Sequence, residues 1–221
     1  MDALLSAIVG DDRRTVATLL GADQGLAIRL VREPRLHQSG ILHWIYAGDT
    51  ALHLAAAGHR VEIVRSLLDV GADPNAAQNH RRSGPLHYAA DGPVGEPCWD
   101  ANRQVATLNV LLNSGARIHA QDRNGATALH RAVRTRCAAA VRFLLRMGAD
   151  PALGNRSGST PFHLAVQNTG RGGSGSEAAV TGQQDIIRAF LEAGVSPDLV
   201  DGRGRSVRES VRSDWIQELL R

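Results

Sequence analysis

The chain has 221 residues, of which 43% are hydrophobic and 21% are charged, and this is the composition of a folded protein rather than a disordered one. Its formal net charge is only +3 and its basic residues, all arginine, are spread along the chain, so the charge pattern does not indicate a dedicated nucleic-acid binder. Aromatic residues make up only 4%, which favours closely packed helices over a β-sandwich.

The first residues favour a cytoplasmic protein. The segment MDALLSAIVGDDRR has too short an apolar run for a signal peptide, and no later stretch approaches the ~20 apolar residues that span a membrane. The exclusive use of arginine is typical of a GC-rich, bacterial genome. Cys98 and Cys137 are too few for a disulfide framework, so we expect reduced thiols, with a redox pair or a metal half-site as the alternative.

Residues 1–47 are expected to form an N-terminal cap and lead-in. Residues 1–20 read as a helix pair with no hairpin before it, and a long lead-in over 21–40 follows. The apolar residues of the lead-in are Leu26, Ile28, Leu30, Val31 and Leu36. We favour a structural cap in which they cover the apolar stretch from Trp44 through Ile45 to Tyr46. In the alternative, Trp44 and Tyr46 are an exposed hot spot for a partner.

From residue 48 onward the chain repeats itself. The pattern G-x-T-x-L-H-x-A, followed by an apolar helix and Leu-Leu-x-x-Gly-Ala-Asp, occurs in 48–75 and again in 125–151. Related copies begin at 83–90 and 158–166 and close at 108–122 and 186–198. A degenerate copy over 204–221 is expected to form the C-terminal cap, because the end units of stacked arrays are atypical.

Each residue of the repeated pattern has a mechanical role. A threonine is expected to cap the first helix, a proline fits its first position, and the histidine three residues after the cap can hydrogen-bond back to it. A glycine after the second helix suits a left-handed C-terminal residue. The residues concerned are Thr50, Thr127 and Thr160; Pro85 and Pro161; His53, His87, His130 and His163; and Gly71, Gly115, Gly148 and Gly194. Gly84 replaces the threonine in one copy, which puts that cap in doubt.

These copies resemble the ankyrin repeat, a unit of a β-hairpin-like turn and two antiparallel helices with a T-P-L-H-x-A signature. The resemblance implies an all-α ankyrin-repeat solenoid of about six stacked helix pairs with short β-hairpin-like fingers. We expect a single domain over 1–221, with four repeats in 48–203 between the two caps. The resemblance also implies a non-catalytic module that binds another protein, with no cofactor and no metal.

Two insertions interrupt the register of the repeats. The histidine spacings are 34, 43 and 33 residues, so about ten extra residues lie near 91–103, and a second insertion lies near 168–182. Both fall at the turn between the two helices of a repeat and should flank the turn of the fourth unit. We therefore expect a small anion recess there, with these residues: Arg134, Arg136, Trp99, Gly172 and Gly173. The alternative is two solvent loops beside a solvated edge.

The expected partner surface combines the finger tips with exposed positions of the first helices. The tips carry a row of arginines, and we expect the exposed helix positions to be Leu54, Tyr88, Arg131 and Leu164. The resulting partner-binding residues are Arg81, Arg82, Tyr88, Arg123, Arg131, Arg156 and Arg203. Arginine and tyrosine commonly dominate interface energetics, so an acidic protein partner is expected; the alternative is that the finger positions are simply polar.

Other functions have weaker signals. An anion or nucleic-acid-backbone binder would use Arg134, Arg136 and the GRGGSG stretch at 170–175, but the low net charge argues against nucleic acid. That stretch satisfies G-x-G-x-x-G without the parallel sheet that a dinucleotide site requires. The repeated histidines are one per unit and too far apart to share a zinc ion, and no catalytic constellation suggests an enzyme. A monomer is assumed.

Overall fold

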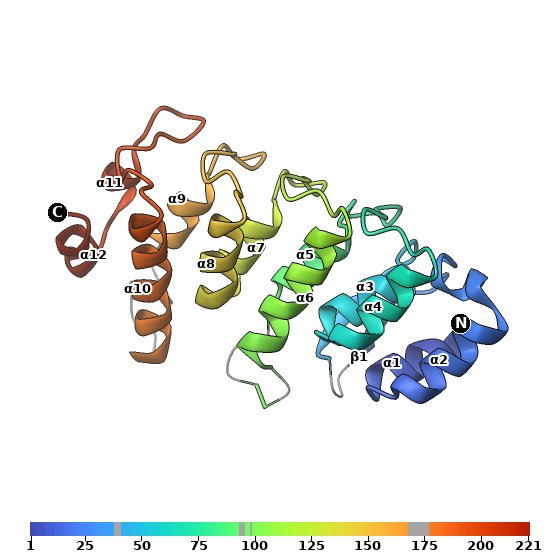
Figure 1. Ribbon diagram of the computed structural model, residues 1–221. Helices are drawn as coiled ribbons and strands as arrows, with labels where there is room; N and C mark the ends of the chain where they lie inside the picture. The colour runs from blue at the N-terminus through green and yellow to red at the C-terminus, as the bar shows by residue number, and fades with distance from the viewer. Residues whose placement is uncertain (38–40, 93–95, 98, 168–176) are drawn as a thin grey trace.

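The computed structural model describes residues 1–37, 41–92, 96–97, 99–167 and 177–221. These residues form a curved row of six helix pairs packed side by side (Figure 1). The pairs are α1 (Asp2–Val9) with α2 (Arg13–Ala22), α3 (Ala51–Ala57) with α4 (Val61–Asp69), α5 (Pro85–Ala90) with α6 (Ala101–Asn113), α7 (Ala128–Arg134) with α8 (Ala138–Arg146), α9 (Pro161–Ala165) with α10 (Glu177–Glu192), and α11 (Val207–Ser210) with α12 (Asp214–Leu219).

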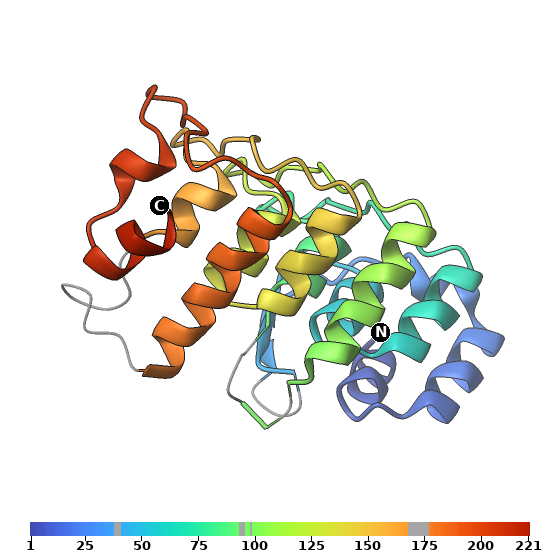
Figure 2. The ribbon, with the colours of Figure 1, turned by 60° about the vertical axis from the view of Figure 1, so that its left-hand side comes forward.

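The helices lie in two layers. The first helices of the pairs contact each other in sequence, from α1 through α3, α5, α7 and α9 to α11, and the second helices from α2 to α10 do the same. Figure 2 shows the second helices as a parallel row in front of the first. Small side chains allow the close approach, since Ala55, Ala56, Ala89 and Ala90 are completely buried.

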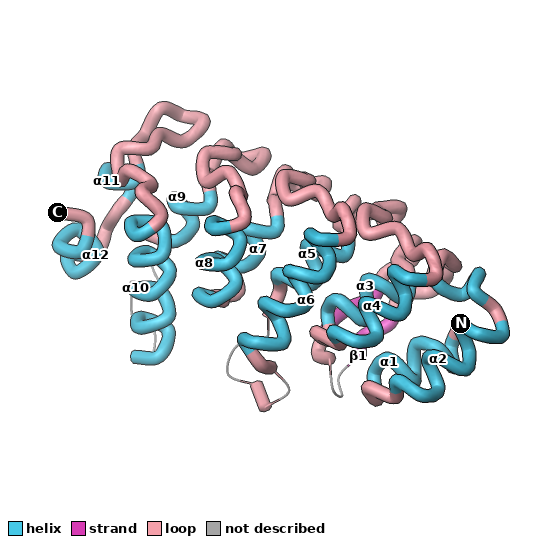
Figure 3. Tube along the Cα trace, viewed as in Figure 1, coloured by secondary structure: helices cyan, strands magenta, loops and turns pink. Residues whose placement is uncertain are grey.

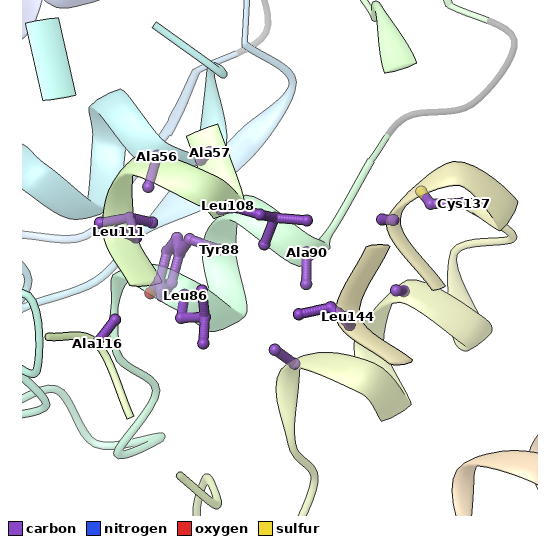
Figure 4. Packing of buried hydrophobic residues seen from close by; sticks show 14 of the residues in the cluster. Ala56, Ala57, Leu86, Tyr88, Ala90, Leu108, Leu111, Ala116, Cys137 and Leu144 are labelled. Atoms are coloured by element: carbon purple, nitrogen blue, oxygen red, sulfur yellow. The ribbon is translucent and has the colours of Figure 1, made fainter. Parts of the chain in front are cut away.

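The core is continuous from the first pair to the last. Figure 4 shows Leu86, Tyr88 and Ala90 of α5 packed with Leu108 and Leu111 of α6, beside Leu144 of α8. Each pair therefore buries its apolar face against both neighbours, which is how stacked repeats gain stability that one repeat cannot reach alone. The architecture expected from the repeats is confirmed.

Each turn between repeats is built around one Asn or Asp side chain. The Oδ1 atom of Asp122 accepts hydrogen bonds from the backbone N–H groups of Asn124 and Ala126, at 2.8 and 3.0 Å. The same two bonds recur at the equivalent positions Asn79, Asn155 and Asp201. We call the turns they organise, 79–83, 122–126, 155–159 and 201–205, the fingers. Such side-chain bonds to the following backbone favour a tight turn over a continuing helix.

Neighbouring fingers are joined by backbone hydrogen bonds. The N–H of Arg123 donates to the carbonyl of Arg81 at 2.7 Å, and the N–H of Arg156 donates to the carbonyl of Asn124 at 2.9 Å. Gly202 donates to Gly158 in the same way at 2.9 Å. The fingers therefore stand in a fixed order along one edge of the molecule.

The lead-in forms a hairpin of its own. Strand β1 (Arg35–His37) pairs antiparallel with β2 (His43–Ile45), with Arg35 opposite Ile45 and His37 opposite His43. Figure 3 shows these strands in magenta behind α4, and β2 contacts α3. A short 3-10 helix, η1 (Gln24–Ala27), and backbone bonds between Val31 and residues 48–49 connect the lead-in to the first repeat.

Both insertions are partly helical, which corrects the boundaries expected from the sequence. Helix α10 begins at Glu177, so 177–182 extend a helix instead of a loop, and α6 begins at Ala101. Consequently α6 and α10 are longer than α8, which lies between them and starts only at Ala138. Within the described ranges, no helix has the length and apolarity needed to cross a membrane.

Candidate functional site

The repeated histidines link each cap to the following finger. The N–H of Thr50 donates to Nδ1 of His53 at 3.0 Å, and Nε2 of His53 donates to the carbonyl of Ser83 in the next finger at 3.1 Å. His87, His130 and His163 make the corresponding Nε2 bonds to Ala126, Ser159 and Arg205. Burial lowers the pKa of His53, His87 and His130, so these rings are neutral and structural.

Two caps depart from the threonine pattern. The N–H of Gly84 still donates to Nδ1 of His87 at 3.1 Å, so the cap that the sequence put in doubt keeps this bond. At the last repeat Ser206 is the cap and Glu209 takes the place of the histidine, accepting from the N–H of Ser206 at 2.7 Å. Thr127 and Thr160 accept the predicted bonds from backbone N–H groups, whereas Thr50 occupies the cap position with its hydroxyl 3.0 Å from Nδ1 of His53. Gly71, Gly115, Gly148 and Gly194 have φ between 75° and 92°.

The expected exposure of the first-helix positions is wrong for three of the four, and the fourth, Leu164, is half-buried. Tyr88 is 1% exposed, Arg131 is 2% exposed, and Leu54 is completely buried. The reason for Tyr88 is that the β1–β2 hairpin covers it: the His43 ring lies 4.8 Å from the Tyr88 ring, and the Tyr88 hydroxyl donates to Asp49 at 2.7 Å. Tyr88 and Arg131 are therefore internal residues and cannot contact a partner.

Arg131 is held between two carboxylates. Its guanidinium donates to Asp91 Oδ2 at 2.7 Å, to Asp122 Oδ2 at 2.8 Å and to the Ser83 hydroxyl at 2.7 Å. Burial opposes a charge on Asp91, yet the hydrogen bond from His43 and the charge of Arg131 hold its pKa well below the usual range. The side chains of α7, a finger and the end of α5 are thereby joined inside the protein.

The residues of the apolar stretch before the first repeat differ in their solvent exposure. Ile45 is completely buried, whereas Trp44 is 46% exposed and Tyr46 is half-buried. Leu26 and Val31 of the lead-in are buried, but Ile28 and Leu30 are exposed. The Tyr46 ring lies beneath the guanidinium of Arg81, 5.4 Å from it, and its hydroxyl accepts a bond from Arg81 at 3.1 Å. Arg81 is thus already engaged within the chain.

The remaining arginines of the predicted row are exposed. They lie one on each finger: Arg82, Arg123, Arg156 and Arg203. In the part of the chain that the structure describes, none of these four guanidiniums forms an ion pair with a carboxylate. The hydrogen bonds between fingers keep them on one edge.

The predicted anion recess is only partly present. Trp99 and Arg136 do line one cleft of about 580 Å³ at the start of α8, but Glu177 and Asp185 of α10 line it as well. Arg134 lies outside it and pairs with Asp91 at 3.3 Å. Gly172, Gly173 and Cys98 lie outside the described residues. Because two carboxylates face the same space, a recess for anions is not what the described side chains form.

Sequence reasoning missed the network around Arg131. Its partner Asp91 and the His43 that contacts Asp91 lie outside the repeated pattern, and nothing in their spacing marks them as neighbours in space. One signal was present: Arg131 follows the buried histidine of its copy and precedes an apolar pair, a position at which a charged residue requires a compensating charge if it is inside.

Comparison with known proteins supports the repeats. Residues 98–201 match the family model described as ankyrin repeats (3 copies), and residues 47–79 match the single ankyrin repeat. Mouse ankyrin repeat and SOCS box protein 6 is 37% identical over 84 residues, which are 38% of this chain and 18% of that protein. Human NF-kappa-B inhibitor zeta is 36% identical over 99 residues, covering 41% of this chain and 14% of that protein.

A relative with an enzyme name shares only a limited segment. L-asparaginase of Dirofilaria immitis is 35% identical over 133 residues, covering 49% of this chain and 22% of that protein. The chain spans less than a fifth of the length of the SOCS box protein and less than a quarter of the asparaginase. What these proteins share with the chain is a stretch of their length, not their whole architecture.

Proposed function

Because the chain belongs to the ankyrin-repeat family, whose repeats generally mediate protein–protein interactions, we propose that it binds an acidic surface of another protein through the exposed arginines of its fingers. The observation that carries the proposal is the row of four exposed finger arginines that have no carboxylate partner within the described chain. These residues are Arg82, Arg123, Arg156 and Arg203. The module acts by binding and not by catalysis.

What distinguishes the finger arginines is their position along one edge and not the lack of an ion pair. On the helices, Arg142 pairs with Glu192 at 3.4 Å and Arg65 pairs with Glu62 at 3.9 Å, but other exposed helix arginines of the described chain, such as Arg14, have no carboxylate partner. On the fingers, Arg205 pairs with Asp201 at 3.2 Å, whereas the four arginines of the row follow each other along the edge without such a pair. Guanidinium groups bind carboxylates in a planar, bidentate geometry, so a row of them favours an acidic partner and speeds its association.

The partner surface differs from the one that the sequence suggested. The lead-in hairpin contacts α3 through β2 and Tyr88 of α5 through His43, and the buried charges of Asp91 and Asp122 neutralise Arg131. These observations support a proposed contact on the fingers, with Trp44 as an exposed aromatic residue at the N-terminal end. An exposed tryptophan beside a charged row is a common composition for an interface.

The test compares partner capture by the wild-type protein and by a variant with Arg123→Gln and Arg156→Gln. Proteins retained from the source organism's lysate without and with nuclease are identified for the wild type, and their affinities are then measured. Each exposed charge pair contributes about 0.5–1 kcal/mol, so we expect the double variant to bind about five- to thirtyfold more weakly. The control is Arg14→Gln, which removes an exposed arginine from α2.

The two outcomes are distinct. If the double variant and the wild type bind the partner with equal affinity, the fingers do not form the interface. Loss of all captured protein on nuclease treatment would instead favour binding to a nucleic-acid backbone, for which affinity also falls steeply with added salt.

A further inference from the structure

A cleft beside the first finger is lined by the end of that finger, the start of α5 and the repeat-linking residues 74–77 and 117–121. It has a volume of about 680 Å³, and Arg82 and Arg117 both line it. Leu86 and Ile118 contribute apolar lining, and His119 lines it as well. No aspartate or glutamate is among its described lining residues, so its charged side chains are both positive.

The two arginines are attached to fixed backbone. The side chain of Asn75 accepts the N–H of Arg117 at 2.9 Å and donates to the carbonyl of Gly115 at 2.9 Å, which holds the wall that carries Arg117. The N–H of Arg82 closes the first finger by donating to the carbonyl of Asn79 at 2.9 Å. A site on a rigid backbone loses less entropy when a ligand binds.

The charged side chains that line the cleft are positive. In the described chain neither Arg82 nor Arg117 forms an ion pair. His87, which also lines the cleft, has a pKa lowered to about 4 by burial and by the charge of Arg131, so it adds no charge at neutral pH. A lining that combines two guanidinium groups with apolar side chains suits a side chain with methylene groups and a terminal carboxylate.

We propose that this cleft receives a glutamate side chain from an extended acidic segment of a partner protein, with the carboxylate between Arg82 and Arg117 and the methylene groups on Leu86 and Ile118. The inference rests on the proposed function in that the partner is acidic. It goes further by placing one anchor residue outside the finger row, since Arg117 is not on a finger.

The experiment uses the full chain and a fluorescein-labelled octaglutamate peptide, with binding followed by fluorescence anisotropy at low salt. Arg82→Gln and Arg117→Gln are each expected to weaken binding about three- to fivefold, as for exposed charge pairs. Arg14→Gln on α2 should leave the affinity within about 1.5-fold of the wild type, which separates the cleft from the general effect of one lost charge. Ala77→Glu, which places a carboxylate in the cleft lining, should weaken binding while both arginines remain.

Amide NMR spectra locate the peptide. We expect the amide resonances of residues 75–77, 82–84 and 117–121 to shift when octaglutamate is added. It is overturned if octaglutamate does not bind, if Arg117→Gln binds as tightly as Arg14→Gln, or if the shifts lie elsewhere. Suppose that Arg117→Gln binds the captured partner normally while the variant with Arg123→Gln and Arg156→Gln binds it weakly. That result would reject the cleft proposal and leave the finger proposal standing. Normal binding of the captured partner by both variants would reject both.

Discussion

Arg131 on α7 and Asp91 after the end of α5 are 40 positions apart in the chain and joined in the core by a Nη1–Oδ2 hydrogen bond of 2.7 Å. Asp122 binds the same guanidinium from a finger, and Nε2 of His43 in the lead-in hairpin lies 3.4 Å from the same Oδ2 atom of Asp91. Arg131 thus links α7 to the segment after α5 and to the finger at 122–126. This explains why a residue predicted to contact a partner is instead part of the scaffold.

Removal of the Asp91 charge should destabilise the fold. In Asp91→Asn, Arg131 keeps Asp122 but loses half of its compensating charge while it remains buried, and we expect the free energy of unfolding to fall by about 2–3 kcal/mol. Urea denaturation followed by circular dichroism measures it. Asp198→Asn is the control, because Asp198 is 74% exposed in its pair with Arg208 and its loss should cost less than about 1 kcal/mol. Equal effects of the two substitutions would contradict a structural role for the buried pair.

Stability should fall as the pH is lowered from 6.5 to about 4. Burial lowers the pKa of His59 from 6.5 to about 4, so in this range the unfolded chain binds a proton that the folded protein does not. The loss for this one residue is roughly 3 kcal/mol. The measurement is the unfolding free energy at several pH values for the wild type and His59→Gln. The variant should show a shallower slope, and parallel curves would refute the assignment.

Below about pH 4 the folded protein should lose stability for a second reason. The pKa values of Asp91 and Asp122 are lower in the folded protein than their ordinary value of 3.8, so their stabilising contribution is present above that value and is lost as the pH falls further. Asp91→Asn should reduce this second loss and leave the slope between pH 4 and 6.5 in place.

The two neighbours Trp44 and Ile45 should behave differently. Ile45→Ala deletes a completely buried side chain and is expected to cost about 2–4 kcal/mol of stability. Trp44→Ala removes a side chain that is 46% exposed, so a cost of about 1 kcal/mol is expected, together with weaker capture of the partner. Thermal or urea unfolding and the capture assay measure both. A Trp44→Ala protein as unstable as Ile45→Ala would show that Trp44 is mainly a structural residue.

The repeated pattern was enough to predict the architecture, because each of its residues acts locally. Thr127 caps a helix that begins at the next residue, His130 binds back to that cap, and the glycine at 148 ends the following helix. These interactions span a few residues, so they can be read from spacing alone. The finger arginines were also located correctly in the turns, since Arg123 and Arg156 follow the residue that organises each turn.

Exposure along the stack was decided by the tertiary structure. Tyr88 and Arg131 stand at positions that the repeat pattern leaves open, but a hairpin from the lead-in and a carboxylate from an insertion cover them. The start of α10 at Glu177 and the carboxylates beside Arg136 likewise depend on how the inserted residues pack. The sequence by itself determined the helix pairs, their caps and their order, because those depend on local bonds. Which charged side chains are buried and which remain available to a partner depended on contacts between residues tens of positions apart, and those contacts exist only in the folded chain.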